Sequence, residues 1–358
     1  MINELKKKKV FTKLPLTVLR HKNKNNNRNH INKPPSTSNK NSIDKINSIL
    51  INNLYYNLIT RNQNPSKPLP SKPHIKTTVI PITKYPITIQ TQSPSMRPPP
   101  RFTPFKEYSY QEDKNKRDYM KDFHLITPKL NRDPAQALFA IFDGHGGRKP
   151  AVFCKDNFAL VFEKCLRATN GNVEKSIMYT FNKVDSDILA KLKEEEQMGS
   201  TATMIYISIN NENKRVIYCA NVGDSKGYLL KKTGECIKIT KEHTCKDQTE
   251  VDRIKKKGGY VFNERVFGSL MVTRSIGDKE MKQYGVISEP YISHFNIDNS
   301  QDSYIIIASD GIWDIIDEEK LAMFAKEEMP ADALCKRLVK MSLEGGTNDN
   351  ISCIVIKL

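Results

Sequence analysis

The chain has 358 residues, 38% of them apolar, and a formal net charge of +17, which allows one large domain or two small ones. The charge is uneven, because residues 1–100 carry 18 of the 57 basic side chains but only Glu4 and Asp44 of the 40 acidic ones. No run approaches about 18 consecutive apolar residues, so we expect no membrane span. The seven cysteines form no CxxC pair, which argues against a zinc knuckle and a disulfide framework.

Residues 1–104 are rich in Lys, Asn and Pro, and we predict a mostly disordered tail because they bury too little apolar surface to offset their ordering entropy. Residues 43–62 have apolar side chains at helical spacing, which predicts a short amphipathic helix. The tail's charge leaves three functional alternatives open: a nuclear import patch, a contact with nucleic acid or an acidic partner, and an organellar presequence. Residues 105–358 form the predicted folded domain. Its charges nearly balance, so we do not expect nucleic-acid binding.

Apolar periodicity predicts the elements of this domain in chain order. We expect strands and helices as follows: strands at 117–126 and 138–142, helices at 151–166 and 173–196, strands at 199–209, 216–222, 228–231 and 235–239, a helix at 249–257, a strand at 303–308, helices at 317–328 and 331–343, and a strand at 351–356. Most strands follow one another as hairpins and the long helices come in pairs. The pattern therefore predicts an α+β fold with antiparallel sheets and helices packed outside, rather than βαβ repeats.

Carboxylates recur where apolar runs end. Asp143 follows Phe-Ala-Ile-Phe and precedes a turn with three glycines, Asp224 and Asp310 end two later runs, and Asp349 precedes another. Taken alone, Asp143-Gly144 could be an ordinary turn. Several carboxylates at the ends of buried strands are costly to ionise unless a cation balances them, and oxygen ligands favour Mg²⁺ or Mn²⁺ over Zn²⁺.

Six stretches in one order resemble the type-2C (PPM family) metal-dependent protein serine/threonine phosphatases. They are Phe142-Asp143-Gly144-His145-Gly146-Gly147, Gly199-Ser200-Thr201-Ala202, Asn221-Val222-Gly223-Asp224-Ser225, Arg265-Val266-Phe267-Gly268-Ser269-Leu270 with Arg274-Ser275-Ile276-Gly277-Asp278, Ser309-Asp310-Gly311-Ile312-Trp313-Asp314, and Asp349-Asn350. The matching region runs from Arg117 to the C-terminus. Its middle part is similar to the integrin-linked-kinase-associated branch of the family.

The resemblance implies a PP2C-like α-β-β-α sandwich with a centre for two Mg²⁺ or Mn²⁺ ions at one edge. It implies these metal ligands: Asp143 bridging both ions, Asp310 and Asp349 on the first, the Gly144 carbonyl on the second, and Asp224 and Asp314 on a weaker third ion. A metal-bridging hydroxide would attack phosphorus directly, without a phosphoenzyme. Segment 246–295 matches the family's flap, whose implied role is substrate choice.

Two further residues match catalytic positions of the family. Arg117 matches the arginine that holds the substrate phosphate, a task that suits a guanidinium fork. His145 matches the proposed general acid, which would protonate the serine or threonine leaving group. The alternatives from the residues themselves are a surface charge at Arg117, a loop histidine at His145 and a helix cap at Asp314. We expect structural roles for His124, His243 and His294, and core packing for Trp313.

The sequence departs from the family at one ligand position. The family pattern Arg-x-x-Met-Glu-Asp is here Arg117-Asp118-Tyr119-Met120-Lys121-Asp122, so Lys121 replaces a glutamate that binds the second metal. A protonated lysine has no acceptor atom. A shifted register that uses Glu112 would leave nine extra residues before the strand.

The main hypothesis is accordingly an active phosphatase with a second metal site weakened by Lys121. The alternatives are a pseudophosphatase that binds partners without turnover, and a nucleic-acid-binding protein. We expect phosphorylated proteins as substrates, a monomer, and a cytoplasmic or nuclear location.

Overall fold

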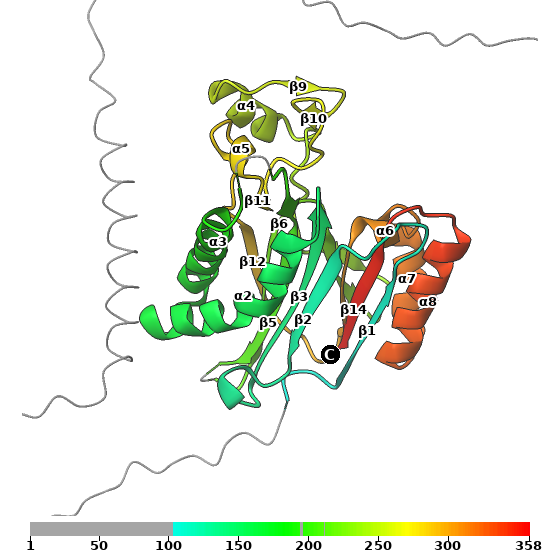
Figure 1. The fold of residues 1–358 in the computed structure, drawn as a ribbon. Helices are drawn as coiled ribbons and strands as arrows, with labels where there is room; N and C mark the ends of the chain where they lie inside the picture. Colours follow the sequence, from blue (N-terminus) through cyan, green and yellow to red (C-terminus); the bar gives the residue numbers. More distant parts are fainter. Residues whose placement is uncertain (1–102, 194–195, 211) are drawn as a thin grey trace, which may run out of the picture. The chain divides into compact units, whose positions relative to one another are not determined.

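The computed structural model of the protein describes residues 103–193, 196–210 and 212–358. The helix expected at 43–62 lies outside the described residues. Within them, two antiparallel sheets are stacked face to face, and helices cover both outer faces (Figure 1). The predicted sandwich of two antiparallel sheets flanked by helices is confirmed. None of the helices in these ranges combines the length and hydropathy that crossing a membrane requires.

The larger sheet has the strand order β11-β4-β3-β5-β6-β12, with β2 paired to β3. Its strands are β2 (Asp122–Thr127), β3 (Gln136–His145), β4 (Gly199–Ser200), β5 (Ala202–Ile209), β6 (Arg215–Val222), β11 (Ile276–Gly277) and β12 (Tyr291–Asn296). The long helices α2 (Lys149–Ala168) and α3 (Val173–Leu189) pack on its outer face (Figure 1). Phe158 and Phe181 of these helices lie in the core beside Phe142 of β3.

The smaller sheet has the order β1-β14-β13-β7-β8. Its strands are β1 (Glu107–Asp113), β7 (Lys226–Lys231), β8 (Cys236–Lys238), β13 (Asp302–Ala308) and β14 (Ile351–Lys357). Its outer face is covered by α7 (Glu318–Lys326) and α8 (Ala331–Glu344), and the short helix α6 (Asp310–Trp313) directly follows β13. A single 3-10 turn, η1 (Leu130–Arg132), precedes β3.

Alternation along β3 places the site between the two sheets. Phe139 and Ile141 point into the core that both sheets share, whereas Leu138 and Phe142 point toward the helices. Successive side chains of a strand face opposite ways, so Asp143 continues the inward row of Phe139 and Ile141. Asp143 therefore lies between the sheets, at the edge where β3 ends.

A small subdomain, which we call the flap (residues 248–282), lies at one end of the sandwich (Figure 1). It contains α4 (Gln248–Lys256), the hairpin β9 (Val261–Phe262) and β10 (Arg265–Val266), and α5 (Lys279–Lys282). Its base is held by Glu250, which is 1% exposed and pairs with Arg253 at 2.6 Å and Arg274 at 2.7 Å. The last residues of the expected flap, 291–295, instead belong to β12 and extend the larger sheet.

The strand predicted from residue 117 begins at Asp122 instead. Residues 114–121 form the link by which the chain leaves β1 in the smaller sheet and enters β2 in the larger one. Asn115 has a φ of +52° and donates its side-chain N–H to the Thr347 carbonyl at 2.6 Å, which fixes this turn. Arg117 and Lys121 lie on this crossing, beside the site.

One helix end and two whole strands also differ from expectation. The second helix ends at Leu189 rather than 196, although Leu192 beyond its end is still buried in the same core. Two edge strands, β1 and β12, were not predicted, because they lack an apolar run and none of their residues is fully buried.

Candidate metal and phosphate site

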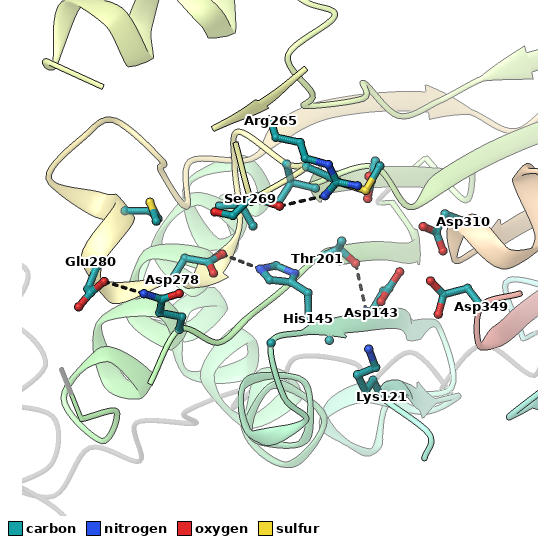
Figure 2. A pocket seen from close by; sticks show the side chains of 18 of the residues that line it. Lys121, Asp143, His145, Thr201, Arg265, Ser269, Asp278, Glu280, Asp310 and Asp349 are labelled. Atoms are coloured by element: carbon teal, nitrogen blue, oxygen red, sulfur yellow. Dashed lines mark hydrogen bonds and ion pairs between the residues drawn. The ribbon is translucent and has the colours of Figure 1, made fainter. Parts of the chain in front are cut away.

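Four of the predicted carboxylates line one cavity of about 460 Å³ at the edge of the sandwich. Asp143 lies two residues before the end of β3, Asp224 lies in the β6–β7 loop, Asp310 begins α6 just after β13, and Asp349 precedes β14. Strands from both sheets thus bring these side chains together (Figure 2). The four aspartates therefore share one cavity, and their roles as metal ligands stay a prediction.

The electrostatics of this cluster favour a cation. Burial, followed by repulsion from neighbouring carboxylates, raises the pKa of Asp143 and Asp310 well above the usual range. The Oδ1 atom of Asp310 is buried and has no hydrogen-bond partner within the described ranges. A positive charge placed among these groups would relieve both the repulsion and the unpaired oxygen.

The carboxylates fit a hydrated cation better than a bare one. In the part of the chain that the structure describes, no three carboxylate, histidine or cysteine side chains are close enough to enclose an ion by themselves. Mg²⁺ usually keeps several waters and takes only one or two carboxylates directly. Oxygen donors that line a cavity of this size therefore suit Mg²⁺ or Mn²⁺ with waters completing the coordination.

Gly144 closes the cavity near β2. Its N–H donates to the Lys121 carbonyl at 3.2 Å, and a Cβ at this position would lie 2.9 Å from that same oxygen. A side chain would therefore not fit here without moving the backbone. The role of the Gly144 carbonyl as a metal ligand stays a prediction.

Arg117 lies at the rim of the cavity. Its side chain is 44% exposed, and its Nη2 atom pairs with Oδ2 of Asp349 at 2.5 Å. The guanidinium is thus both open to solvent and directly beside a predicted metal ligand, which is the location a phosphate-binding residue requires.

Lys121 also lines the cavity, and Figure 2 shows its ammonium pointing to the side that carries Asp143. Its backbone N–H donates to Oδ1 of Asn350 at 2.8 Å, which fixes its place before β2. Among the described residues it makes no ion pair. Glu112 lies in β1 and does not line the cavity, so the shifted register is excluded.

Asp122, next to Lys121, joins the two sheets beneath the cavity. It is 2% exposed, and the Ser309 hydroxyl donates to its Oδ2 at 2.7 Å. Burial raises the pKa of Asp122 to about 6, and the nearby Asp349 carboxylate adds to this rise. Ser309 precedes Asp310, so this bond fixes the segment that carries Asp310, after a strand of one sheet, to a strand of the other.

His145, the last residue of β3, lines the same cavity and pairs with a residue for which the sequence predicted no role. Its Nε2 atom is 2.7 Å from Oδ2 of Asp278, which is 5% exposed (Figure 2). Burial disfavours the charged imidazole, but the Asp278 carboxylate outweighs it, so the pKa of His145 is raised. The signal for Asp278 was its place in the Arg274–Asp278 motif, but 133 residues separate it from His145.

The remaining predicted residues lie elsewhere. Asp314 ends α6 and does not line the cavity, and the side chain that caps the next helix belongs to Asp317. Trp313 is 8% exposed and donates to the Ala308 carbonyl, as expected of a core residue. The three histidines expected to be structural do not line the cavity either, namely His124, His243 and His294.

The flap supplies the wall opposite the carboxylates. Arg265, Leu270 and Met271 line the cavity from this side, and Arg265 donates to the Ser269 carbonyl at 2.9 Å. Met271 is 51% exposed. This wall combines an apolar surface with the Arg265 guanidinium and the Glu280 carboxylate, and so could contact residues beside a phosphorylated side chain.

Residues 106–351 match the family model described as protein phosphatase 2C. The chain is 31% identical to protein phosphatase 2C homolog 1 of Schizosaccharomyces pombe, over 69% of this chain and 72% of that protein. It is 32% identical to probable protein phosphatase 2C 52 of Oryza sativa subsp. japonica, over 71% of this chain but only half of the rice protein.

Among solved structures, the fold is similar to a serine-threonine phosphatase 2C from Toxoplasma gondii, with a TM-score of 0.58 at 20% identity over 72% of this chain and 96% of that one. It is also similar to a C. elegans sex determining protein, with a TM-score of 0.63 at 24% identity over 70% and 64%. These relatives do not test the similarity to the integrin-linked-kinase-associated branch, which stays a prediction.

Proposed function

Because the chain belongs to the protein phosphatase 2C family of protein serine/threonine phosphatases, we propose that it hydrolyses phosphoserine and phosphothreonine with two divalent ions, the second held weakly. The observation that carries this proposal is the single cavity lined by Asp143, Asp310 and Asp349 together with Arg117 and His145. No relative tests these roles in this chain.

Each residue has a distinct task in the proposed reaction. Asp143, Asp224, Asp310 and Asp349 would hold Mg²⁺ or Mn²⁺, and the bound ions would supply Lewis acidity and a more acidic water. Asp314 does not line the cavity, so its proposed part in a weaker third site rests on the family pattern alone.

Arg117 binds and orients the phosphate with its guanidinium fork. His145 donates a proton to the leaving oxygen, which is needed because serine and threonine alkoxides are poor leaving groups. General acid catalysis of this kind typically contributes about 10²–10⁴-fold.

The test uses the full chain with Mn²⁺ or Mg²⁺, a phosphothreonine peptide and p-nitrophenyl phosphate. Asp143→Asn should remove activity toward both substrates. Asp156→Asn, an exposed position on α2, is the matched control and should keep it. An active wild type whose activity survives Asp143→Asn would contradict the proposal.

Lys121 favours a second candidate function, a pseudophosphatase that binds phosphoproteins without turnover. Its ammonium lines the cavity where a carboxylate would help to hold the second ion. At an effective dielectric near 20, its repulsion with a divalent ion close by is on the order of several kcal/mol. In the active-enzyme proposal Lys121 swings aside or its ammonium replaces the second ion.

Three variants at Lys121 separate the candidates. Lys121→Glu restores an oxygen ligand and should raise activity at low Mn²⁺. Lys121→Gln should raise it less, and Lys121→Met separates the loss of charge from the gain of a ligand. A wild-type chain that binds a phosphopeptide but has no turnover, with activity only in Lys121→Glu, would establish the pseudophosphatase.

We further propose that the chain acts as a monomer in the cytoplasm or nucleus and acts on phosphorylated proteins. Light scattering of the purified chain and imaging of a tagged copy test the first two points. A stable oligomer or a membrane location would contradict them.

A further inference from the structure

We propose that Asp278 is a positioning residue that fixes the imidazole of His145 for proton donation; this rests on the proposed function. The two side chains meet at 2.7 Å between Nε2 and Oδ2. The carboxylate is 5% exposed, whereas the imidazole is 29% exposed. A buried acceptor therefore holds one nitrogen of a ring whose other edge is open to the cavity.

The backbone of Asp278 is held in an unusual conformation. Its φ is +49°, in the left-handed region that residues other than glycine seldom adopt, and it follows Gly277 with a φ of +93°. Such a conformation is strained for a residue with a side chain and persists only where the surroundings enforce it. A backbone outlier whose side chain contacts a cavity-lining histidine points to a functional constraint.

Three contacts enforce this conformation. The Asp278 N–H donates to the Met198 carbonyl at 2.7 Å, and the Gly277 N–H donates to Oδ1 of Asp185 in α3 at 2.8 Å. The Ser275 hydroxyl donates to Oδ2 of Asp278 at 2.5 Å. The carboxylate thus has a second donor besides His145, so its position does not depend on the imidazole.

The strand β4 completes the arrangement. Gly199 of β4 pairs with His145 on one side and with Gly277 on the other. A Cβ on Gly199 would overlap both Oδ2 of Asp278 and Nε2 of His145. The absence of a side chain at this position is what allows the ion pair to form directly over the strand.

The pairing assigns different tasks to the two ring nitrogens. Asp278 engages Nε2, so Nδ1 is the atom left to donate to the substrate. A water oxygen forms the new bond to phosphorus while the bond to the serine or threonine oxygen breaks and leaves its electron pair there. The Nδ1 proton of His145 joins that oxygen, and the proton that the water loses restores the imidazolium. Throughout, Nε2–H donates to Asp278.

The test compares substrates that differ in their need for a proton. A phosphothreonine peptide releases a poor leaving group, whereas p-nitrophenyl phosphate releases a stable phenolate. Asp278→Ala should lower kcat for the peptide by about 10–100-fold, with little change in KM and a much smaller loss for p-nitrophenyl phosphate. The same pattern is expected for His145→Ala, and the double variant should be no worse than His145→Ala.

Asp278→Asn is a second variant that separates positioning from misfolding. It keeps the shape of the side chain and an oxygen acceptor, so it should retain more peptide activity than Asp278→Ala. Asp252→Ala, an exposed carboxylate on the flap, is the matched control. Equal losses for the two substrates, or additive losses in the double variant, would overturn the proposal.

If the wild type hydrolyses neither substrate, the proposed function fails. In that case ¹⁵N NMR of His145 still tests whether Asp278 holds the imidazole. A proton on Nε2 that is lost or exchanges faster in Asp278→Asn supports it. An unchanged imidazole spectrum refutes it.

Discussion

Gly199 offers a direct test of how much the His145–Asp278 pair matters, because it can be disturbed without changing either member. Gly199 does not have a positive φ, so alanine is acceptable to its backbone. Its Cβ, however, would fall within 3.0 Å of both members of the pair, closer than real Cβ atoms come to other atoms. The imidazole and the carboxylate must therefore move apart in Gly199→Ala.

Two magnitudes follow. Overpacking of this kind typically costs about 1–3 kcal/mol of stability. Loss of a correctly placed general acid lowers kcat for a phosphothreonine peptide by about 10²-fold, the low end of the usual range. Urea unfolding measures the first quantity and steady-state kinetics the second, with p-nitrophenyl phosphate as the substrate that should be affected least.

Gly171→Ala is the control for a general loss of stability. Gly171 has a φ of +80° in the α2–α3 loop, and a Cβ added there would have no other atom within 4 Å. It should lose stability of the order of 1 kcal/mol from backbone strain and keep its kcat. A folded Gly199→Ala protein with kcat within twofold of wild type would refute the reasoning.

Three further predictions concern metal, pH and the flap. Mn²⁺ at 100 times its Kd should raise the free energy of unfolding by about 2.7 kcal/mol, which thermal scanning would show as a Tm higher by about 5–10 °C. The Asp310→Asn variant should lose most of this shift. A wild-type Tm that Mn²⁺ does not change would contradict the metal site. Burial above all, then Arg274, lowers the pKa of His243 to about 3. Below about pH 6.5 the unfolded state therefore binds a proton on His243 that the folded state does not bind. The free energy of unfolding should be at its full value above that pH and should fall below it by at most about 1.4 kcal/mol per pH unit. Urea titrations at pH 5 and 7 should show a smaller pH dependence for His243→Asn than for the wild type, and an equal pH dependence would contradict this role of His243. Met271→Ala should raise KM several-fold for phosphopeptides with a large apolar neighbour and leave p-nitrophenyl phosphate unchanged; equal effects on both would exclude a flap contact.

The carboxylates that line the cavity could be singled out from the sequence because each is coupled to a local pattern. A buried apolar run, read with the alternation of a strand, places Asp143 and Asp310 near strand ends. Which ends share an edge follows from the pairing: β3 and β6 both pair with β5 and so end at the same edge, and the start of β14 lies beside the end of its antiparallel partner β13. Residues on connecting segments were harder to place from the sequence. Arg117 was assigned to a strand, yet it lies in the turn fixed by Asn115, whose partner is more than 200 residues away.

The contact of Asp278 with His145 was harder still to predict from the sequence. Gly277-Asp278 has the composition of an ordinary turn, and nothing local indicates that the aspartate contacts His145. The contact exists because β4 lies between two segments that are distant in sequence. The edge strands β1 and β12 escaped prediction for a related reason, since their pairing with β14 and β6 outweighs their polar composition.

The ion pair between Arg117 and Asp349 has a thermodynamic consequence. Asp349 cannot give the same oxygen fully to a guanidinium and to a cation, and Arg117 cannot give all its donors to both a carboxylate and a phosphate. A cation that occupies Asp349 frees the guanidinium for an anion, and an anion that captures Arg117 frees the carboxylate for a cation. The two binding equilibria are therefore linked, and linkage is reciprocal. Inorganic phosphate should tighten Mn²⁺ binding by the same factor by which Mn²⁺ tightens phosphate binding.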